Sequence, residues 1–192
     1  MVCTGNICRS PMMERIMRDA VARGGGHMVI HTSSAGTWAR NGEPMQPFAA
    51  ATLTEQHVDA SGFRAIRLTE DLVRPCDLVI TATREHRSHV VGLVPGVVRR
   101  TFTLLELARV ATSSSVPARL EAPGTAEHLR ASVAWAAQLR GSVSRREESV
   151  DDLDDPLGTP LEVYRERAEA ITRAVEQIVP FLMGERGATA AG

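Results

Sequence analysis

Two cysteines and an arginine lie within the first nine residues, in the stretch CTGNICR that begins at Cys3. Gly5 and Asn6 are residue types that tolerate the strained backbone of a tight curl. A short strand, such a curl and a helix beginning near Ser10 would point several backbone N–H groups at one place. That arrangement is an anion-binding nest at the positive end of a helix dipole.

Cys3 and Arg9 are the candidate catalytic residues of this nest. The guanidinium of Arg9 is a planar fork that matches two phosphoryl oxygens. The positive surroundings favour the thiolate form of Cys3, and a thiolate held against a bound phosphate is a nucleophile directed at phosphorus. The spacing alone occurs often by chance in a chain with 22 arginines, so the evidence is the combination of residue types in a strand–loop–helix context.

A second element is required, because loss of the leaving alcohol needs a proton. The stretch EESVDDLDDP, which begins at residue 147, carries six acidic residues. Neighbouring negative charges favour the protonated form of a carboxyl group, which suits a general acid. We interpret Asp151 and Asp152 as part of a solvated acidic loop, which leaves Asp154 and Asp155 as the rival candidates for the acid.

The elements that would position these residues alternate along the chain. Amphipathic spacing and capping residues predict helices, and short apolar runs predict strands. The expected helices are 10–23, 47–57, 84–94, 105–110 and 159–183, and the expected later strands are 27–36, 76–83 and 97–104. This alternation predicts an α/β fold with a doubly wound, four-stranded parallel sheet flanked by helices. Ligands of such sheets bind at the carboxyl ends of the strands, where the opening loop would lie.

Residues 111–149 differ in character from the rest of the chain. A Ser/Pro/Gly-rich connection leads into one added helix at 125–141 and then into a charged loop. We therefore expect a single domain over residues 1–183, with 111–149 as a helical insertion before the acidic stretch, and a flexible tail over 184–192.

Composition limits the classes of partner. The net charge of −1 provides no general attraction to nucleic acid or to anionic membranes. All 22 basic residues are arginines, which excludes lysine chemistry such as a Schiff base. No apolar run approaches the roughly 18 residues that cross a bilayer, and we expect no secretory leader. Three cysteines are too few for a disulfide scaffold, so we expect a cytoplasmic protein. From the net charge and the lack of a long apolar run we expect no nucleic-acid partner and no membrane insertion.

Three stretches together resemble a known family. VCTGNICRSPMME at the N-terminus is similar to the phosphate-binding signature of the low-molecular-weight protein tyrosine phosphatases of bacteria, and SSAGTWARNGEP (33–44) and DDPLGTPLEVYRE (154–166) agree in order and spacing. The resemblance implies a phosphorylated protein as substrate, a double displacement through a phosphocysteine at Cys3, and no cofactor or metal. It also selects Asp155, from the Asp-Pro pair, as the acid that protonates the leaving group.

The resemblance also assigns roles within the loop. Arg9 and the backbone amides of residues 4–9 would hold the phosphoryl oxygens, Ser10 would hydrogen-bond the sulfur, and Asn6 would brace the curl. The residues that it places around the substrate are Thr4, Gly5, Asn6, Ile7, Cys8, Ser10 and Trp38.

Several residues keep two interpretations. Cys8 either forms a protective reversible disulfide with Cys3, as the resemblance implies, or is a small buried side chain. Trp38 either forms an aromatic wall beside the substrate or packs in the core. Cys76 is interpreted as structural. His86 and His89 are interpreted as part of a solvated helix face rather than as a metal site.

The sequence also departs from the family pattern. Only Met1 and Val2 precede Cys3, so we expect a truncated first strand. For this reason a catalytically impaired module that binds phosphate or phosphoproteins is an alternative to an active phosphatase. Leu157 and Gly158 stand where phosphotyrosine-specific members often have aromatic residues.

Two related enzyme classes remain to be compared. The related branch of protein-arginine phosphatases tends to place a threonine at the position of Ile7, whose apolar side chain suits an aromatic ring, so we expect phosphotyrosine first and phosphoarginine as the alternative. Arsenate reductases need an additional pair of cysteines some seventy residues on, and Cys76 stands alone there.

Overall fold

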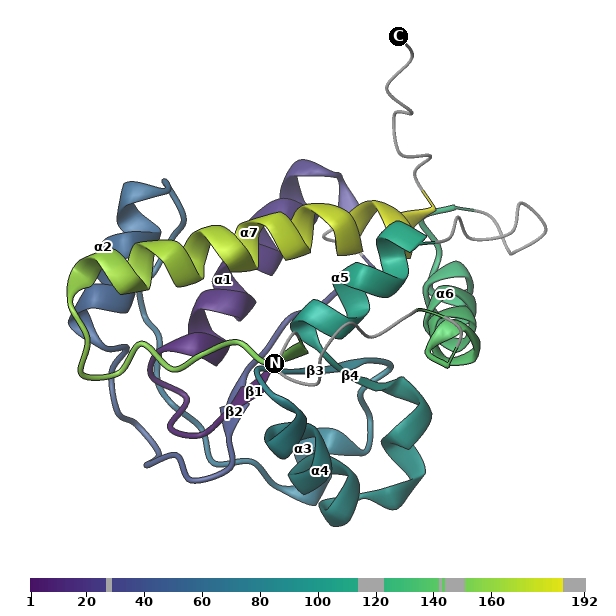
Figure 1. Ribbon diagram of the computed structural model, residues 1–192, viewed down its shortest axis with the longest axis horizontal. Coiled ribbons are helices and arrows are strands. Elements are labelled where there is room, and N and C mark those ends of the chain that lie inside the picture. The colour runs from purple at the N-terminus through teal and green to yellow at the C-terminus, as the bar shows by residue number, and fades with distance from the viewer. Residues whose placement is uncertain (27–28, 114–122, 142, 144–150, 185–192) are drawn as a thin grey trace, which may run out of the picture.

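A four-stranded parallel sheet forms the centre of the molecule (Figure 1). The computed structural model describes residues 1–26, 29–113, 123–141, 143 and 151–184. The strands are β1 (Val2–Cys3), β2 (Ala35–Gly36), β3 (Val79–Thr81) and β4 (Thr101–Thr103), in the order β2-β1-β3-β4. All three pairings are parallel, which confirms the predicted fold class.

The helices cover both faces of this sheet (Figure 1). Helices α1 (Arg9–Arg23), α5 (Leu104–Ser113) and α7 (Leu161–Met183) pack on one face, and α2 (Pro47–Glu55) packs against α1 and α7. Helices α3 (Glu70–Val73) and α4 (Arg84–Leu93) cover the other face. Two separate apolar clusters result, a large one under α1, α5 and α7 and a small one built mainly from valines under α3 and α4. The sheet is therefore doubly wound.

The strands are shorter than the sequence predicted. Residues 29–34 of the expected strand 27–36 are not in a strand, and residues 27–28 lie outside the described part. A 3₁₀ helix, η2 (Pro95–Arg100), occupies the first half of the expected strand 97–104. The central strand β1 has only two residues, and it pairs with β2 at two positions and with β3 at one.

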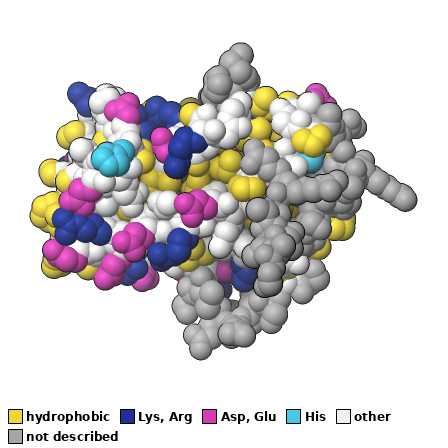
Figure 2. Space-filling view, turned by 90° about the horizontal axis from the view of Figure 1, so that it is seen from above, with side chains coloured by type: hydrophobic (Ala, Val, Ile, Leu, Met, Phe, Trp, Pro, Cys, Tyr) yellow, Lys and Arg dark blue, Asp and Glu magenta, His cyan; other side chains and the backbone are white. Residues whose placement is uncertain are grey.

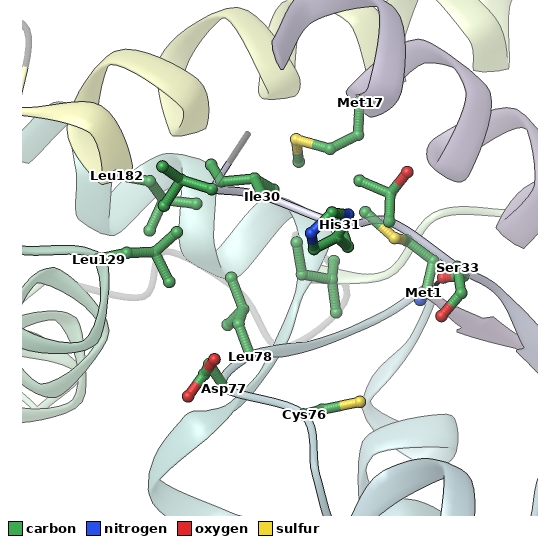
Figure 3. Close-up of a pocket in the computed structure, with 13 residues that line it drawn as sticks. Met1, Met17, Ile30, His31, Ser33, Cys76, Asp77, Leu78, Leu129 and Leu182 are labelled. Carbon is green, nitrogen blue, oxygen red and sulfur yellow. Dashed lines mark hydrogen bonds between the residues drawn. The ribbon is translucent and has the colours of Figure 1, made fainter. Parts of the chain in front are cut away.

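The short central strand is nevertheless fully integrated. Val2 and Cys3 are 3% and 2% exposed, and they pair with both neighbouring strands. The Met1 carbonyl accepts a hydrogen bond from the Ala35 N–H at 2.9 Å, and the Val2 carbonyl accepts one from the Ala82 N–H at 2.8 Å. Met1, just before β1, lines a cavity together with Met17, Leu78 and other residues (Figure 3).

The added helix of the insertion is confirmed as α6 (Ala126–Leu139). The side chain of Thr125 accepts a hydrogen bond from the His128 N–H and so caps it. This helix packs against α5, α7 and η2. Much of the rest of the insertion (114–122, 142 and 144–150) and the predicted tail from residue 185 lie outside the described residues, so the domain boundaries stay predictions.

Helix α7 is the long helix that the C-terminal pattern predicted. Leu161 is half-buried, and the buried residues that follow at helical spacing include Tyr164, Ala168, Ile171, Val175, Ile178 and Leu182. The helix ends at Gly184, whose φ of 72° is the left-handed conformation common after helix ends. Among the described residues, no helix has the length and apolarity needed to span a membrane.

Gly36 is required where β2 passes under the opening loop. A Cβ atom at this position would lie 2.4 Å from the Thr4 carbonyl oxygen and 2.8 Å from the Asn6 backbone nitrogen. We predict that Gly36→Ala lowers the free energy of unfolding by about 1–3 kcal/mol, the usual cost of overpacking. Denaturant unfolding monitored by circular dichroism measures this loss.

The matched control is Gly92→Ala. Gly92 lies inside α4, and an added Cβ would meet no atom within 4 Å. This substitution should leave stability unchanged or raise it by up to about 1 kcal/mol. Equal stability of the Gly36→Ala protein and the unsubstituted protein would contradict the close packing of β2 against the loop.

Candidate active site

Residues 4–8 form a curl that connects β1 to the N-terminus of α1. Arg9 is the first residue of this 15-residue helix, and Cys8 precedes it without a side-chain cap. Asn6 has a φ of 54°, the left-handed conformation that the sequence analysis expected in this curl. The helix N-terminus and the backbone of the curl therefore meet at the carboxyl end of the central strand, which is the usual ligand position in such sheets.

The side chain of Asn6 holds this curl in place. It is fully buried, and its amide nitrogen Nδ2 donates to Ser10 Oγ at 2.8 Å and to Ser34 Oγ at 2.9 Å. Its oxygen Oδ1 accepts a hydrogen bond from the Ile66 N–H at 2.8 Å. Every polar atom of the Asn6 side chain is thus used, which fits the bracing role that the resemblance implied.

Ser10 lies beside the candidate nucleophile. Cys3 Sγ and Ser10 Oγ are 2.9 Å apart, and both residues are buried. Ser10 Oγ accepts a hydrogen bond from Asn6, so its own proton is free to donate. Two acceptors lie within reach of that proton, Cys3 Sγ at 2.9 Å and the Ala35 carbonyl at 3.4 Å. A hydroxyl that donates to Cys3 Sγ stabilises negative charge there.

Arg9 and Asp155 meet at the mouth of the curl. Arg9 Nη2 lies 2.5 Å from Asp155 Oδ2, and Arg9 Nη1 donates to the Leu153 carbonyl at 3.3 Å. The Leu153 N–H donates to the Ala82 carbonyl at 2.8 Å, just after β3, which anchors the acidic segment beside the loop. Arg9 is 5% exposed, whereas the Asp155 side chain is 42% exposed, so the carboxylate faces solvent while the guanidinium is enclosed.

The neighbouring carboxylates are used differently. Asp154 has a 78% exposed side chain and pairs with Arg167 at 3.3 Å, so it does not face the loop. Asp151 is 3% exposed and accepts two hydrogen bonds from Arg109, at 2.9 and 3.0 Å. The interpretation of Asp151 as solvated was therefore wrong, because an ion pair with Arg109 takes the place of water around the buried carboxylate.

Asp152 also has a structural role. Its Oδ1 accepts a hydrogen bond from the Arg84 backbone N–H at 2.7 Å, at the first residue of α4. A carboxylate at that position stabilises a helix N-terminus. Asp152 remains partly solvated, since 31% of its side chain is exposed, and it adds this helix contact, which the sequence interpretation did not include.

Cys8 is buried on the inner side of the curl. Its Sγ lies 3.8 Å from the hydroxyl of Tyr164, a buried residue of α7. Burial raises the pKa of the Cys8 thiol to about 11. Cys3, Cys8 and Cys76 are all free thiols, and the redox role of Cys8 stays a prediction.

Trp38 lies at the rim of the curl rather than in the core. Its side chain is 66% exposed, and its backbone N–H donates to the Thr4 carbonyl at 2.9 Å. The guanidinium of Arg67 lies 4.8 Å from the centre of its ring, a cation–π contact. The core-packing interpretation of Trp38 is thus wrong. Ile7 is half-buried in the curl, and its carbonyl accepts a hydrogen bond from Gln46.

His86 is the residue that sequence reasoning misplaced. It is 6% exposed, and its two ring nitrogens lie 2.9 Å from Thr4 Oγ1 and 2.6 Å from Thr83 Oγ1. Burial, and then the nearby charge of Arg9, lower the pKa of His86. The available signal was Thr83, a helix-capping residue three positions earlier. His89 is exposed as expected, and the described residues contain no cluster of side chains suited to a metal ion.

Comparison with known proteins agrees with this geometry. The family described as low molecular weight phosphotyrosine protein phosphatase matches residues 1–117. The chain belongs to this family. A crystal structure of a family member from T. tengcongensis superimposes with a TM-score of 0.67 and 27% identity, over 93% of this chain and 94% of that one.

The curated relatives include two kinds of phosphatase. The protein-arginine-phosphatase of Bacillus subtilis (strain 168) is 34% identical over 105 residues, which cover 55% of this chain and 68% of the relative. The probable low molecular weight protein-tyrosine-phosphatase EpsP of Ralstonia solanacearum is 35% identical over 106 residues, 55% of this chain and 69% of the relative. The protein-arginine-phosphatase of Geobacillus stearothermophilus is 24% identical over 185 residues, 96% of this chain and 95% of the relative.

The raised pKa of Cys8 predicts a thiol that resists alkylation. Because this group stays protonated until the pH approaches about 11, iodoacetamide near neutral pH should modify Cys8 much more slowly than half-exposed Cys76. Peptide mass spectrometry after timed quenching measures both rates. In urea the two cysteines should react alike, and equal rates in the folded protein would contradict the prediction.

Proposed function

We propose that this phosphatase hydrolyses phosphotyrosine in proteins through a phosphocysteine at Cys3. The observation that carries the proposal is the convergence of Cys3 Sγ, the enclosed Arg9 guanidinium and the Asp155 carboxylate around one helix N-terminus. A nucleophile, an oxyanion-binding fork and a proton donor are the parts that phosphoryl transfer needs.

In the first step the Cys3 thiolate attacks phosphorus. The S–P bond forms while the bond from phosphorus to the phenolic oxygen breaks. The backbone N–H groups of the curl and the Arg9 guanidinium hold the three other phosphoryl oxygens as their charge changes. These oxygens take the place of Asp155 at Arg9. The released Asp155 carboxylate takes up a proton from solvent and passes it to the leaving phenolate oxygen as the P–O bond breaks.

In the second step water attacks the phosphocysteine. Asp155, now a carboxylate, accepts a proton from the water, and the S–P bond breaks with its electron pair returning to Cys3 sulfur. Ser10 supports this departure, because its hydroxyl lies 2.9 Å from Cys3 Sγ and can donate to the sulfur as negative charge develops.

The rim of the loop supports an aromatic phosphoester as the substrate. Trp38 and Leu157 are 66% and 55% exposed, and half-buried Ile7 adds an apolar group to the curl. Exposed apolar side chains beside a phosphate site match a phenyl ring better than a charged guanidinium. Phosphoarginine in proteins is the second candidate, because two of the relatives named above are protein-arginine-phosphatases.

The chain fits a reducing compartment and one folded unit. The three cysteines are free, and a thiolate nucleophile works only in the reduced form, so we place the enzyme in the cytoplasm, acting on phosphorylated protein substrates. We also propose that residues 1–183 form one domain, with 111–149 inserted. The paired β1 supports an enzyme over a binding module, since the strand that carries Cys3 is fixed on both sides.

The role of Asp155 predicts a specific loss of activity. Asp155→Asn keeps the size of the side chain but removes the transferable proton, so kcat for para-nitrophenyl phosphate should fall by about 10²–10⁴-fold. Steady-state kinetics near neutral pH measure the effect. Cys3→Ser should abolish turnover, whereas the matched control Asp154→Asn should leave kcat almost unchanged, because Asp154 points to Arg167. Equal losses in the two aspartate variants would contradict the assignment.

Substrate preference is tested with two peptides of the same sequence, one carrying phosphotyrosine and one phosphoarginine. We expect a higher kcat/KM for phosphotyrosine. Ile7→Thr should shift the ratio toward phosphoarginine by about tenfold, because a hydroxyl replaces an apolar contact. A preference for phosphoarginine in the unsubstituted enzyme would establish the second candidate instead.

A further inference from the structure

His86 connects the phosphate-binding curl to the start of α4 through hydrogen bonds that the proposed mechanism does not use. Its Nε2 lies 2.9 Å from Thr4 Oγ1, and its Nδ1 lies 2.6 Å from Thr83 Oγ1. Thr4 Oγ1 also accepts a hydrogen bond from Arg9 Nη2 at 3.4 Å. The imidazole of His86 and the guanidinium of Arg9, which would hold the phosphoryl group, therefore share Thr4 Oγ1 as a hydrogen-bond partner.

The hydrogen-bond pattern favours one tautomer of this imidazole. Thr83 Oγ1 accepts a hydrogen bond from the His86 backbone N–H at 3.3 Å, as a helix cap does. If the Thr83 hydroxyl in turn donates to Nδ1, its donor and acceptor capacities are both used, and the imidazole proton sits on Nε2. The opposite tautomer would leave the O–H of half-buried Thr83 without a partner among the described residues.

The consequence falls on Thr4. With the proton on Nε2, Thr4 Oγ1 accepts from both His86 and Arg9, and its own proton remains free to donate. Thr4 is exposed, so this hydroxyl proton can be solvated at no cost before a substrate arrives. The two incoming hydrogen bonds fix the orientation of the hydroxyl, and its proton then points away from Arg9 and His86.

We propose that His86 is a positioning residue for phosphoryl binding: its Nε2–H fixes the Thr4 hydroxyl so that Thr4 donates a hydrogen bond to a phosphoryl oxygen held by Arg9. This inference rests on the proposed phosphatase function and adds Thr4 Oγ1 to its substrate contacts. The lowered pKa of His86 agrees with it, because the imidazole then stays neutral at physiological pH. Arg9, Asp155, Asp152 and Glu85 are the charged groups that act on this imidazole.

Substitution kinetics test the chain of contacts. Thr4→Val removes the hydroxyl, and His86→Leu removes the group that orients it. Each should raise the inhibition constant of orthovanadate and lower kcat/KM for para-nitrophenyl phosphate by about tenfold or more, the size of one hydrogen bond to a charged group. The double variant should lose no more than Thr4→Val alone, because both act through one contact. Thr4→Ser and His86→Gln, which keep the donors, should recover most of the activity.

The matched control is His89→Leu, an exposed histidine of the same helix, which should leave both constants unchanged. Multiplied losses in the double variant, or unchanged constants in His86→Leu, would overturn the proposal. If His86→Leu does not fold, Thr4→Val and the NMR measurement below decide: unchanged constants in Thr4→Val would overturn the proposal.

Nitrogen-15 NMR of the histidines gives a readout independent of activity. We expect a neutral His86 ring with the proton on Nε2 and an acceptor signature at Nδ1, and a proton on Nδ1 would overturn the proposal. Activity of the unsubstituted enzyme distinguishes a failure of the proposed function from a failure of the inference about His86. If it does not turn over para-nitrophenyl phosphate, the proposed function fails, whereas an active enzyme with additive variants fails only the inference about His86.

Discussion

The buried side chain of Asn6 holds together the loop that connects β1 to α1. The curl between β1 and α1 has no strand ladder of its own, and Asn6 adopts a left-handed backbone conformation that most residues avoid. Its three side-chain hydrogen bonds, to Ser10, Ser34 and Ile66, offset that strain and connect the loop to the rest of the fold. Ser34 in turn donates to the buried carboxylate of Glu14 at 2.5 Å, which continues the network into α1. The direction of the backbone amides, and hence the site, depends on this bracing.

The second half of the site is brought to the loop from a distant part of the chain. Leu153 pairs with Ala82 just after β3, Asp151 is fixed by Arg109 and Asp152 caps α4. These anchors leave Asp155 facing Arg9, while Asp154 turns toward Arg167. Neighbouring acids in one run thus have different tasks, and each task is set by the cation or helix end that it meets.

The sequence was a better guide to the position of the opening loop than to the environment of polar residues that are buried by tertiary packing. The placement of Cys3 before the curl and of Arg9 and Ser10 in the first turn of α1 follows from residue types in a strand–loop–helix context, while their catalytic roles stay predictions. The choice of Asp155 over Asp154 needed the family resemblance, since their sequence environments are nearly the same. His86 and Asp151 were missed, because a buried polar residue on a polar-looking helix or loop is recognised only by its partners. The length of β2 was overestimated, because β2 pairs with β1, which offers only two residues, and that of β4 because the η2 helix takes up residues 97–100.

The central claim is that Cys3 carries the phosphoryl group between the two steps. Its most direct measurement is intact-protein and peptide mass spectrometry of enzyme denatured by rapid mixing during turnover of para-nitrophenyl phosphate. The account predicts the added mass of one phosphoryl group, with fragment ions that place it on Cys3 rather than on Cys8 or Ser10. Full turnover with Cys3 unmodified, or with the phosphoryl group on another residue, would contradict it.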